Sequence, residues 1–140
     1  MKILVPVDGS AFTKRMLAYL AAHQDFMGPQ HDYTLLHVVA AVPPRAAAVM
    51  DKETLSGYYA EEAAKVFKPI KPFFAKQGLK ADFVFKTGHA ADIIASLADK
   101  GRYDLLVLGS HGHGSLASLV MGSTSTKVIA QCGVPVLLVR

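Results

Sequence analysis

The sequence has a single cysteine, no tryptophan and no apolar run long enough to cross a membrane. One cysteine cannot form an internal disulfide or build a cysteine metal site alone, so we expect Cys132 to be a small packed residue near a helix end. A membrane-spanning helix needs about 18 or more consecutive apolar residues, so none is predicted. The apolar stretch at the N-terminus is too short for a signal peptide and is followed by Asp8, which predicts a cytoplasmic protein.

Charged residues are also scarce, and neither sign dominates. Of the residues, 19% are charged and 51% are hydrophobic, a balance that supports a sizeable core and excludes a disordered chain. The net charge of +4 is small. Lysines gather between residues 65 and 86, but no aromatic array or known motif accompanies them, so a solvated surface is favoured over nucleic-acid binding. A chain of 140 residues fits one domain, residues 1–140.

Five apolar runs rich in β-branched residues predict β-strands. Several of them are almost continuously apolar, without the alternation of a half-exposed strand. Such runs are typical of parallel sheets covered on both faces. The predicted strands are Ile3–Val7, Tyr33–Val39, Ala81–Phe85, Tyr103–Leu108 and Pro135–Val139.

Helix-compatible segments separate these strands. Crossovers of this length join parallel strands with a right-handed turn, which predicts an α/β fold, a three-layer α/β/α sandwich around a five-stranded parallel sheet. The segment between the second strand and the second helix, residues 40–50, is expected to be a mobile loop. The predicted helices are Ser10–Met27, Asp51–Gln77, Ala90–Lys100 and Ser123–Cys132.

Local signals mark the ends of these helices. Ser10 can cap the first helix, because a serine hydroxyl can accept a free first-turn N–H. Pro69 and Pro72 must kink or divide the second helix, because proline lacks the N–H and clashes with the preceding turn. A glycine follows each helix and can adopt the left-handed conformation that closes it. These glycines are Gly28, Gly78, Gly101 and Gly133.

A glycine-rich segment follows the fourth predicted strand and ends at the start of the last helix. Ligands of open α/β sheets bind at this edge, beyond the carboxyl ends of the strands. Glycines let backbone N–H groups converge, and a helix N-terminus adds unpaired N–H groups and partial positive charge. Ser123, Thr124 and Ser125 add hydroxyl donors, so the segment predicts a phosphate-binding site. Its glycines are Gly109, Gly112, Gly114 and Gly122.

Two common phosphate motifs do not apply here. Gly109 and Gly114 have the separation of a Walker A loop, but Ser115 stands where that motif needs lysine. The stretch from Gly112 to Ala117 matches a dinucleotide fingerprint. That fingerprint belongs after the first strand, with an acidic residue about 20 positions later, and neither condition holds.

Other chemistry is less favoured. His111 and His113 lack a third ligand, so a metal site is disfavoured. Ser115 is not in a nucleophile elbow, because the second glycine is missing, and no catalytic residue is predicted. His37 lies in a predicted strand and is expected to be a packed histidine. Asp8 has an alternative structural role, as a cap of the first helix turn.

The spacing Gly109-x2-Gly112-x9-Gly122-Ser123 resembles the ATP-binding signature of the universal stress protein family. The likeness extends over the chain from Lys2 to Val139. It implies a strand order 3-2-1-4-5, in which Asp8 and the glycine-rich segment face each other across one crevice. Segments that resemble the strands of the family are Ile3–Ser10, Leu35–Val38, Leu105–Gly109 and Val134–Val139.

The resemblance also implies the nucleotide-binding residues. Some members of the family lack the glycine signature and do not bind ATP, whereas this chain keeps it. Mg²⁺ would arrive on the triphosphate with several of its waters. The implied residues are Pro6, Val7 and Asp8 at the adenosine end, Val38 against adenine through its backbone, Gly109, His111 and Gly112 along the phosphates, and Gly122, Ser123, Thr124 and Ser125 at the far phosphates.

Three functions follow as hypotheses. The leading one is a stress-response regulator that binds ATP, or another adenine nucleotide, with little or no turnover and signals to an unidentified protein partner. The second is a slow ATPase or phosphotransferase, although the sequence offers no arginine finger and no convincing base. The third is an interaction protein with a vestigial pocket. By resemblance the chain is expected to form a homodimer through its last strand, Pro135–Val139, whose exposed edge invites strand pairing.

Overall fold

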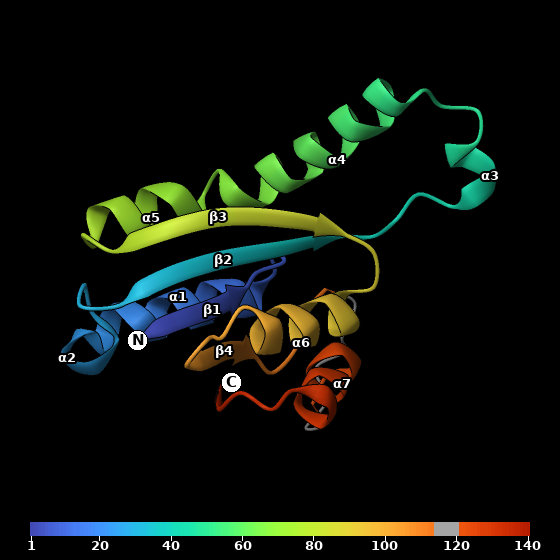
Figure 1. The fold of residues 1–140 in the computed structure, drawn as a ribbon. Coiled ribbons are helices and arrows are strands. Elements are labelled where there is room, and N and C mark those ends of the chain that lie inside the picture. Colours follow the sequence, from blue (N-terminus) through green and yellow to red (C-terminus); the bar gives the residue numbers. More distant parts are fainter. Residues whose placement is uncertain (114–120) are drawn as a thin grey trace.

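The computed structural model describes residues 1–113 and 121–140 (Figure 1). Its five strands form one parallel sheet of order β3-β2-β1-β4-β5. This confirms the predicted fold class and the strand order 3-2-1-4-5. The strands are β1 (Lys2–Pro6), β2 (Asp32–Val39), β3 (Lys80–Thr87), β4 (Leu105–Gly109) and β5 (Val136–Val139).

Helices cover both faces of the sheet, giving three layers. Side chains alternate along β1, so that Ile3 and Val5 pack beneath one group of helices and Leu4 beneath the other. The first core contains residues of α1, α4 and α5, and the second contains residues of α6 and α7. The helices are α1 (Ala11–Ala22), α2 (Gln24–Met27), α3 (Pro44–Ala47), α4 (Lys52–Phe67), α5 (Ile70–Lys76), α6 (Ala90–Lys100) and α7 (Ser123–Gln131).

The first predicted helix is divided at His23, so the prediction of one continuous helix was wrong. The backbone of His23 leaves the helical region, at φ −123° and ψ 45°. Its ring Nδ1 donates to the carbonyl oxygen of Tyr19 at 2.9 Å. A local side-chain hydrogen bond of this kind competes with the helical ladder, and α2 then begins as a separate turn.

The second predicted helix is divided at Pro69, as expected, but Pro72 does not interrupt α5. Pro72 is the third residue of α5, and the first N–H groups of a helix have no intrahelical acceptor. A proline there removes a donor that the helix does not use. At the start of α4, the carboxylate of Asp51 accepts a hydrogen bond from the Thr54 N–H at 2.6 Å.

The prediction of left-handed closing glycines holds only at Gly78, where φ is +67°. At the end of α6 the left-handed residue is Arg102, at φ +54°, while Gly101 keeps helical angles. A Cβ on Gly101 would come within 2.5 Å of the Tyr103 ring. Glycine is therefore required at residue 101 by close packing and not by its φ angle.

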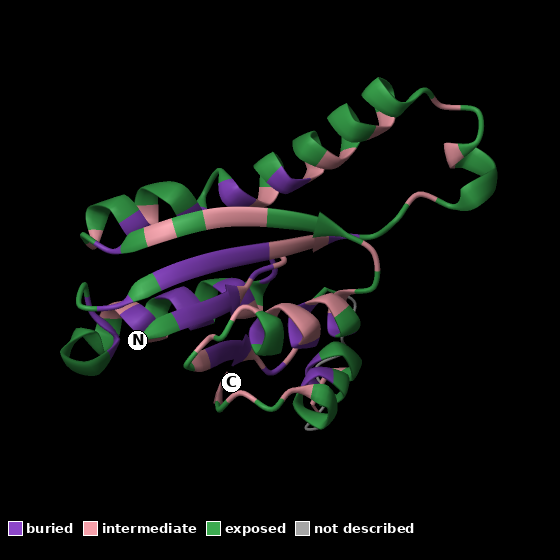
Figure 2. Cartoon of the chain, viewed as in Figure 1, coloured by how far each residue is buried: buried purple, intermediate pink, exposed green. Residues whose placement is uncertain are grey.

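Residues 40–50 were expected to be a loop, but they contain the short helix α3. This segment and the first turns of α4 project beyond the sheet (Figure 1). They are mostly exposed or half-buried (Figure 2), and the Val49 side chain is 87% exposed. None of the residues predicted to bind phosphate lies in this segment.

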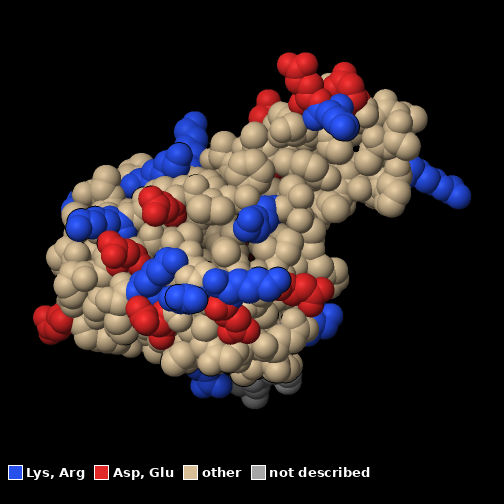
Figure 3. Space-filling model, in the orientation of Figure 1, with Lys and Arg blue, Asp and Glu red and all other residues tan. Residues whose placement is uncertain are grey.

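Lysine and arginine are interspersed with aspartate and glutamate on the face drawn in Figure 3. Such mixing is typical of a solvated surface. Within residues 1–113 and 121–140, no helix combines the length and apolarity that a membrane span requires. Cys132 lies at the C-cap of α7, half-buried against the second core, as predicted.

Candidate functional site

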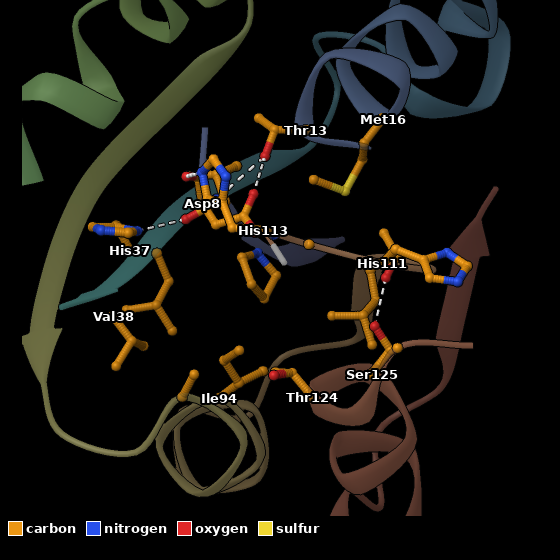
Figure 4. Close-up of a pocket in the computed structure, with 18 of the residues that line it drawn as sticks. Asp8, Thr13, Met16, His37, Val38, Ile94, His111, His113, Thr124 and Ser125 are labelled. Atoms are coloured by element: carbon orange, nitrogen blue, oxygen red, sulfur yellow. Dashed lines mark hydrogen bonds between the residues drawn. The ribbon is translucent and has the colours of Figure 1, made fainter. Parts of the chain in front are cut away.

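A cavity of about 600 Å³ opens at the carboxyl ends of β1 and β4 (Figure 4). These two strands are neighbours in the sheet. The chain leaves β1 toward α1 on one face and leaves β4 toward α7 on the other, which makes this edge the topological switch point of the sheet. All the residues that the sequence predicted for nucleotide binding line this one cavity: Pro6, Val7, Asp8, Val38, Gly109, His111, Gly112, Gly122, Ser123, Thr124 and Ser125.

The cavity is also lined by residues that the sequence did not predict to bind the nucleotide. Thr13 lies five residues after Asp8, on the other side of the start of α1. This spacing is the sequence signal that could have indicated Thr13 as a lining residue. Met16, Ala90 and Ile94 come from helices whose apolar faces predicted only packing. The remaining additional residues are Leu36, His37, Ala40, Leu108 and His113.

Asp8 connects β1 to both α1 and the glycine-rich segment. Its carboxylate Oδ1 accepts hydrogen bonds from the Ser10 N–H at 2.9 Å and the Thr13 hydroxyl at 3.0 Å. Its Oδ2 accepts one from the His113 N–H at 3.1 Å. Burial raises the pKa of Asp8, but the hydrogen bonds from Ser10, His113 and Thr13 outweigh it and hold that pKa below its ordinary value. Asp8 is therefore ionised at neutral pH.

The capping role predicted for the Ser10 hydroxyl was wrong. Ser10 occupies the N-cap position of α1, but its side chain makes no capping hydrogen bond. Its Oγ is buried and has no partner within the described part of the chain. The Asp8 carboxylate accepts hydrogen bonds from the Ser10 N–H and the Thr13 hydroxyl. Neither is a backbone N–H of the first turn of α1, so these bonds fix the start of the helix but are not the capping role considered for Asp8.

Gly112 allows the glycine-rich segment to approach Asp8 closely. A Cβ on Gly112 would lie 2.4 Å from the Asp8 Oδ2. The next residue, His113, contacts Asp8 twice, because its Nε2 also lies 2.7 Å from the Asp8 carbonyl oxygen. The absence of a side chain at residue 112 is thus what lets this contact form.

The N-terminus of α7 lies at the other side of the same segment. The Gly122 N–H donates to the Ser110 carbonyl at 2.8 Å, and the first intrahelical bond runs from the Thr126 N–H to the Gly122 carbonyl at 3.0 Å. The N–H groups of Ser123, Thr124 and Ser125 therefore precede the helical ladder. Such groups, with the helix dipole, favour an anion.

The Ser125 hydroxyl has a different role from the one predicted. It donates to the Gly109 carbonyl oxygen at 2.7 Å and so ties α7 to the end of β4. Its hydrogen is thus used within the protein, and the donor that Ser125 offers to a ligand is its backbone N–H. The side chains of Ser123 and Thr124 are exposed.

The opposite end of the cavity is apolar. Val7, Leu36 and Ile94 line it and are also members of the two buried cores. His37 lies beside them, as a packed histidine, with its Nδ1 2.8 Å from the Val7 carbonyl oxygen and its ring edge-on to Phe67. A flat apolar group such as a nucleobase matches this lining.

Charge is distributed unevenly in the cavity. Its described lining includes one carboxylate, that of Asp8, and three histidines, with no lysine or arginine. Within residues 1–113 and 121–140, no three histidine, cysteine, aspartate or glutamate side chains cluster as a metal site would require. Gly114 and Ser115, which the motif comparisons considered, lie outside the described residues.

Comparisons with known proteins agree on one family. The sequence profile of the Universal stress protein family matches residues 1–140. A universal stress protein of Thermus aquaticus is 33% identical over 139 residues, which are 99% of this chain and 97% of that protein. YxiE of Bacillus subtilis is 30% identical, with 99% and 98% covered. The chain spans 42% of the length of a third relative, Slr1230 of Synechocystis, at 29% identity.

Solved structures share the fold. The structure of MJ0577 from Methanocaldococcus jannaschii has a TM-score of 0.80 and 27% identity, and the match covers 99% of this chain and 94% of that one. An Arabidopsis thaliana member with AMP bound has a TM-score of 0.71 at 18% identity, covering 99% and 90%. An Archaeoglobus fulgidus member in complex with dAMP has a TM-score of 0.70 at 19% identity, covering 100% and 98%.

Proposed function

Because the chain belongs to the universal stress protein family, we propose that it binds an adenine nucleotide, with ATP as its ligand, and acts as a stress-response regulator. The observation that carries the proposal is the cavity at the switch point. One end is apolar and suits adenine, while the other offers the N–H groups that precede the helical ladder of α7 and suits phosphate. AMP and dAMP in structures of the same fold support an adenine nucleotide as the ligand.

In this proposal Pro6, Val7, Asp8 and Val38 line the adenosine end, and the glycine-rich segment and the first turn of α7 hold the phosphates. Mg²⁺ would come with the triphosphate and keep several waters. We expect turnover to be slow or absent. Asp8 is the carboxylate in the described lining, and both of its oxygens already accept hydrogen bonds, so it is not placed as a general base.

Thermal unfolding with millimolar MgATP, ADP, AMP and GTP tests the proposal. A ligand at about 100 times its Kd stabilises the folded state by about 2.7 kcal/mol, which raises Tm by several degrees in a chain of this size. A shift with adenine nucleotides but not with GTP is the expected result. If no nucleotide raises Tm, the chain does not bind nucleotides at these concentrations and the interaction-protein hypothesis takes precedence.

A pair of glycine variants locates the site. A Cβ on Gly122 would lie 3.3 Å from both the His111 Cα and the Ser110 carbonyl oxygen, so Gly122→Val should crowd the segment and remove the ATP-dependent shift. Gly57 lies in the exposed α4, and a Cβ added there would meet no atom within 4 Å, so Gly57→Ala should keep the full shift. Unchanged ATP affinity in Gly122→Val would overturn the site assignment.

We also propose that β5 forms a homodimer interface. Both outer strands of the sheet have one neighbour. The edge strand β3 carries Lys80, Asp82 and Lys86, which blunt strand pairing, whereas β5 reads Val-Leu-Leu-Val without a charge. Sedimentation at micromolar concentration should give twice the chain mass of 15.0 kDa, and a monomer would count against this interface.

A further inference from the structure

A second hollow of the surface is a groove between the edge strand β3 and the helix α6. Its volume is about 480 Å³. Ile93 and Leu97 of α6 line it with aliphatic side chains that are half-buried against the second core. Its described lining has no residue in common with that of the nucleotide cavity. The other lining residues are Lys86, Asp92, Ser96 and Lys100.

The groove forms where α6 leaves the edge of the sheet uncovered. α6 packs against β2, and β3 lies outside β2 in the sheet (Figure 1). Alternate residues of β3 face this side, so that Val84 packs on the second core and Lys86 lines the groove. Gly88 then turns the chain toward α6 at φ +135°, and a Cβ there would lie 2.9 Å from the Ile93 Cδ1. The glycine therefore leaves room for Ile93 at this end of the groove.

The two lysines of the groove have no counter-charge of their own. Lys86 lies near the end of β3 and Lys100 at the end of α6, both are exposed, and neither forms an ion pair with a described residue. The carboxylate in the described lining, that of Asp92, instead lies 3.9 Å from the Nδ1 of His89. The lysine ammonium groups are therefore available to a charged partner.

The surroundings of β3 add to this positive charge. Residues 66–88 contain five lysines and one acidic residue, Asp82. On the opposite face of β3, Lys71 of α5 lies over the ring of Phe83, 5.4 Å from its centroid. Charges gathered in this way raise the local concentration of negatively charged partners.

Charge and lining together select among the possible occupants. A second copy of the chain would bring its own lysines to the groove and be repelled. A nucleic acid would be attracted, but single strands bind by stacking bases on aromatic rings, and the described lining has aliphatic side chains in that place. An acidic peptide with an apolar side chain matches both the lysines and the aliphatic pair.

We propose that this groove is a docking site for an acidic segment of a partner protein. An apolar side chain of the partner lies against Ile93 and Leu97, and its carboxylates lie near Lys86 and Lys100. Burial of the apolar side chain contributes affinity, while the lysines select for negative charge. The inference goes beyond the proposed function, because it identifies where a partner protein binds and involves no residue of the nucleotide cavity.

The test titrates the full chain with a synthetic peptide in which one leucine is flanked on each side by two glutamates. Backbone amide shifts measured by NMR report affinity and location together. We expect saturable shifts concentrated in β3 and α6. Binding should weaken as salt rises toward 1 M, where the Debye length falls to about 3 Å. A peptide with serine in place of leucine should bind roughly fivefold more weakly, as for partial burial of the leucine side chain.

Lysine variants connect the binding to the groove. Lys86→Glu and Lys100→Glu should each weaken the acidic peptide by roughly three- to fivefold, as for the loss of an exposed ion pair. The double variant should prefer a peptide with lysines in place of the glutamates. Lys14→Glu is the matched control, because it makes the same charge change on the exposed surface of α1, which packs over β4 and β5. Thermal unfolding without ligand checks that each variant is folded.

The outcomes separate docking from nucleotide binding. Absence of peptide binding at low salt overturns the docking site, and so does equal binding by the groove variants and the Lys14→Glu control. A single-stranded DNA that shifts the same amides at lower concentration than the peptide would make the groove a nucleic-acid site and also overturn it. The ATP-dependent rise in Tm should be the same in every lysine variant as in the wild type. An ATP shift without peptide binding overturns docking alone.

Discussion

The two ends of the cavity are built from different kinds of structure. The apolar end consists of core residues, since Val7, Leu36 and Ile94 are each at most 5% exposed and pack between sheet and helices. The glycine end consists of backbone groups and short side chains held by hydrogen bonds to Asp8, Ser110 and Gly109. Changes at the apolar end should therefore alter stability and binding together, whereas changes at the glycine end should act mainly on binding.

The largest expected effect is on stability, at the apolar end. Ile94 of α6 is 5% exposed and packs in the second core, so Ile94→Ala should lower the free energy of unfolding by about 2–5 kcal/mol. Urea denaturation measures it. Ile129 on α7 is 39% exposed, and Ile129→Ala should cost well under half as much. A loss in Ile94→Ala no larger than that of Ile129→Ala would mean that this end is not part of the core.

A smaller effect is expected at Gly112, at the glycine end. Its Cβ would lie 2.4 Å from the Asp8 Oδ2, so Gly112→Ala must move the segment away from Asp8. We expect roughly a tenfold loss of ATP affinity, equivalent to about 1.4 kcal/mol, with a modest change in stability. Gly109→Ala is the structural comparison, because its Cβ would come no closer than 3.4 Å to any atom. If the two variants were equally stable and Gly112→Ala kept the ATP affinity of the wild type, the close approach of residue 112 to Asp8 would be contradicted.

Asp8 joins the two ends, and its replacement should act on acid stability. Its pKa is lowered in the folded state, so Asp8 stabilises the fold above the unfolded value of 3.8, and this contribution is lost as the pH falls through the folded pKa. Asp8→Asn should lose roughly 1 kcal/mol at pH 7 and show a flatter decline in acid. The asparagine N–H would also face the His113 N–H. Stability curves from pH 7 to 3 measure both effects, and curves that coincide for variant and wild type would refute them.

The sequence predicted the fold because its signals were local and repeated. Apolar runs without alternation indicate buried parallel strands, and the helices between them indicate right-handed crossovers in a parallel sheet. The strand order and the nucleotide-binding residues were predicted from the resemblance to the family. All of those residues line the cavity. Glycine spacing is readable in a sequence because few other residues allow such close backbone approach.

The details that the sequence did not predict depend on contacts between distant residues. The Ser10 hydroxyl fits a capping rule but makes no capping hydrogen bond, while the Asp8 carboxylate accepts from the Ser10 N–H and the Thr13 hydroxyl. The Ser125 hydroxyl looks like a free donor until the carbonyl of Gly109, sixteen residues earlier, is placed beside it. His113 contacts Asp8, which is 105 residues away in sequence, and only the fold brings the two together. Propensity and spacing rules contain no information about such partners.

The smallest expected effect locates the boundary between the two ends. Thr124 lines the cavity in the first turn of α7, and Thr124→Val removes its hydroxyl while keeping the branched shape. We expect ATP affinity to fall about two- to fivefold, as for one exposed hydrogen bond, and adenosine affinity to stay unchanged. Thr126→Val is the matched control, because the Thr126 hydroxyl donates to the Gly122 carbonyl and does not line the cavity. If Thr124→Val weakened adenosine as much as ATP, this hydroxyl would contact the nucleoside, and the phosphate-binding end would begin deeper in the segment, toward Gly122.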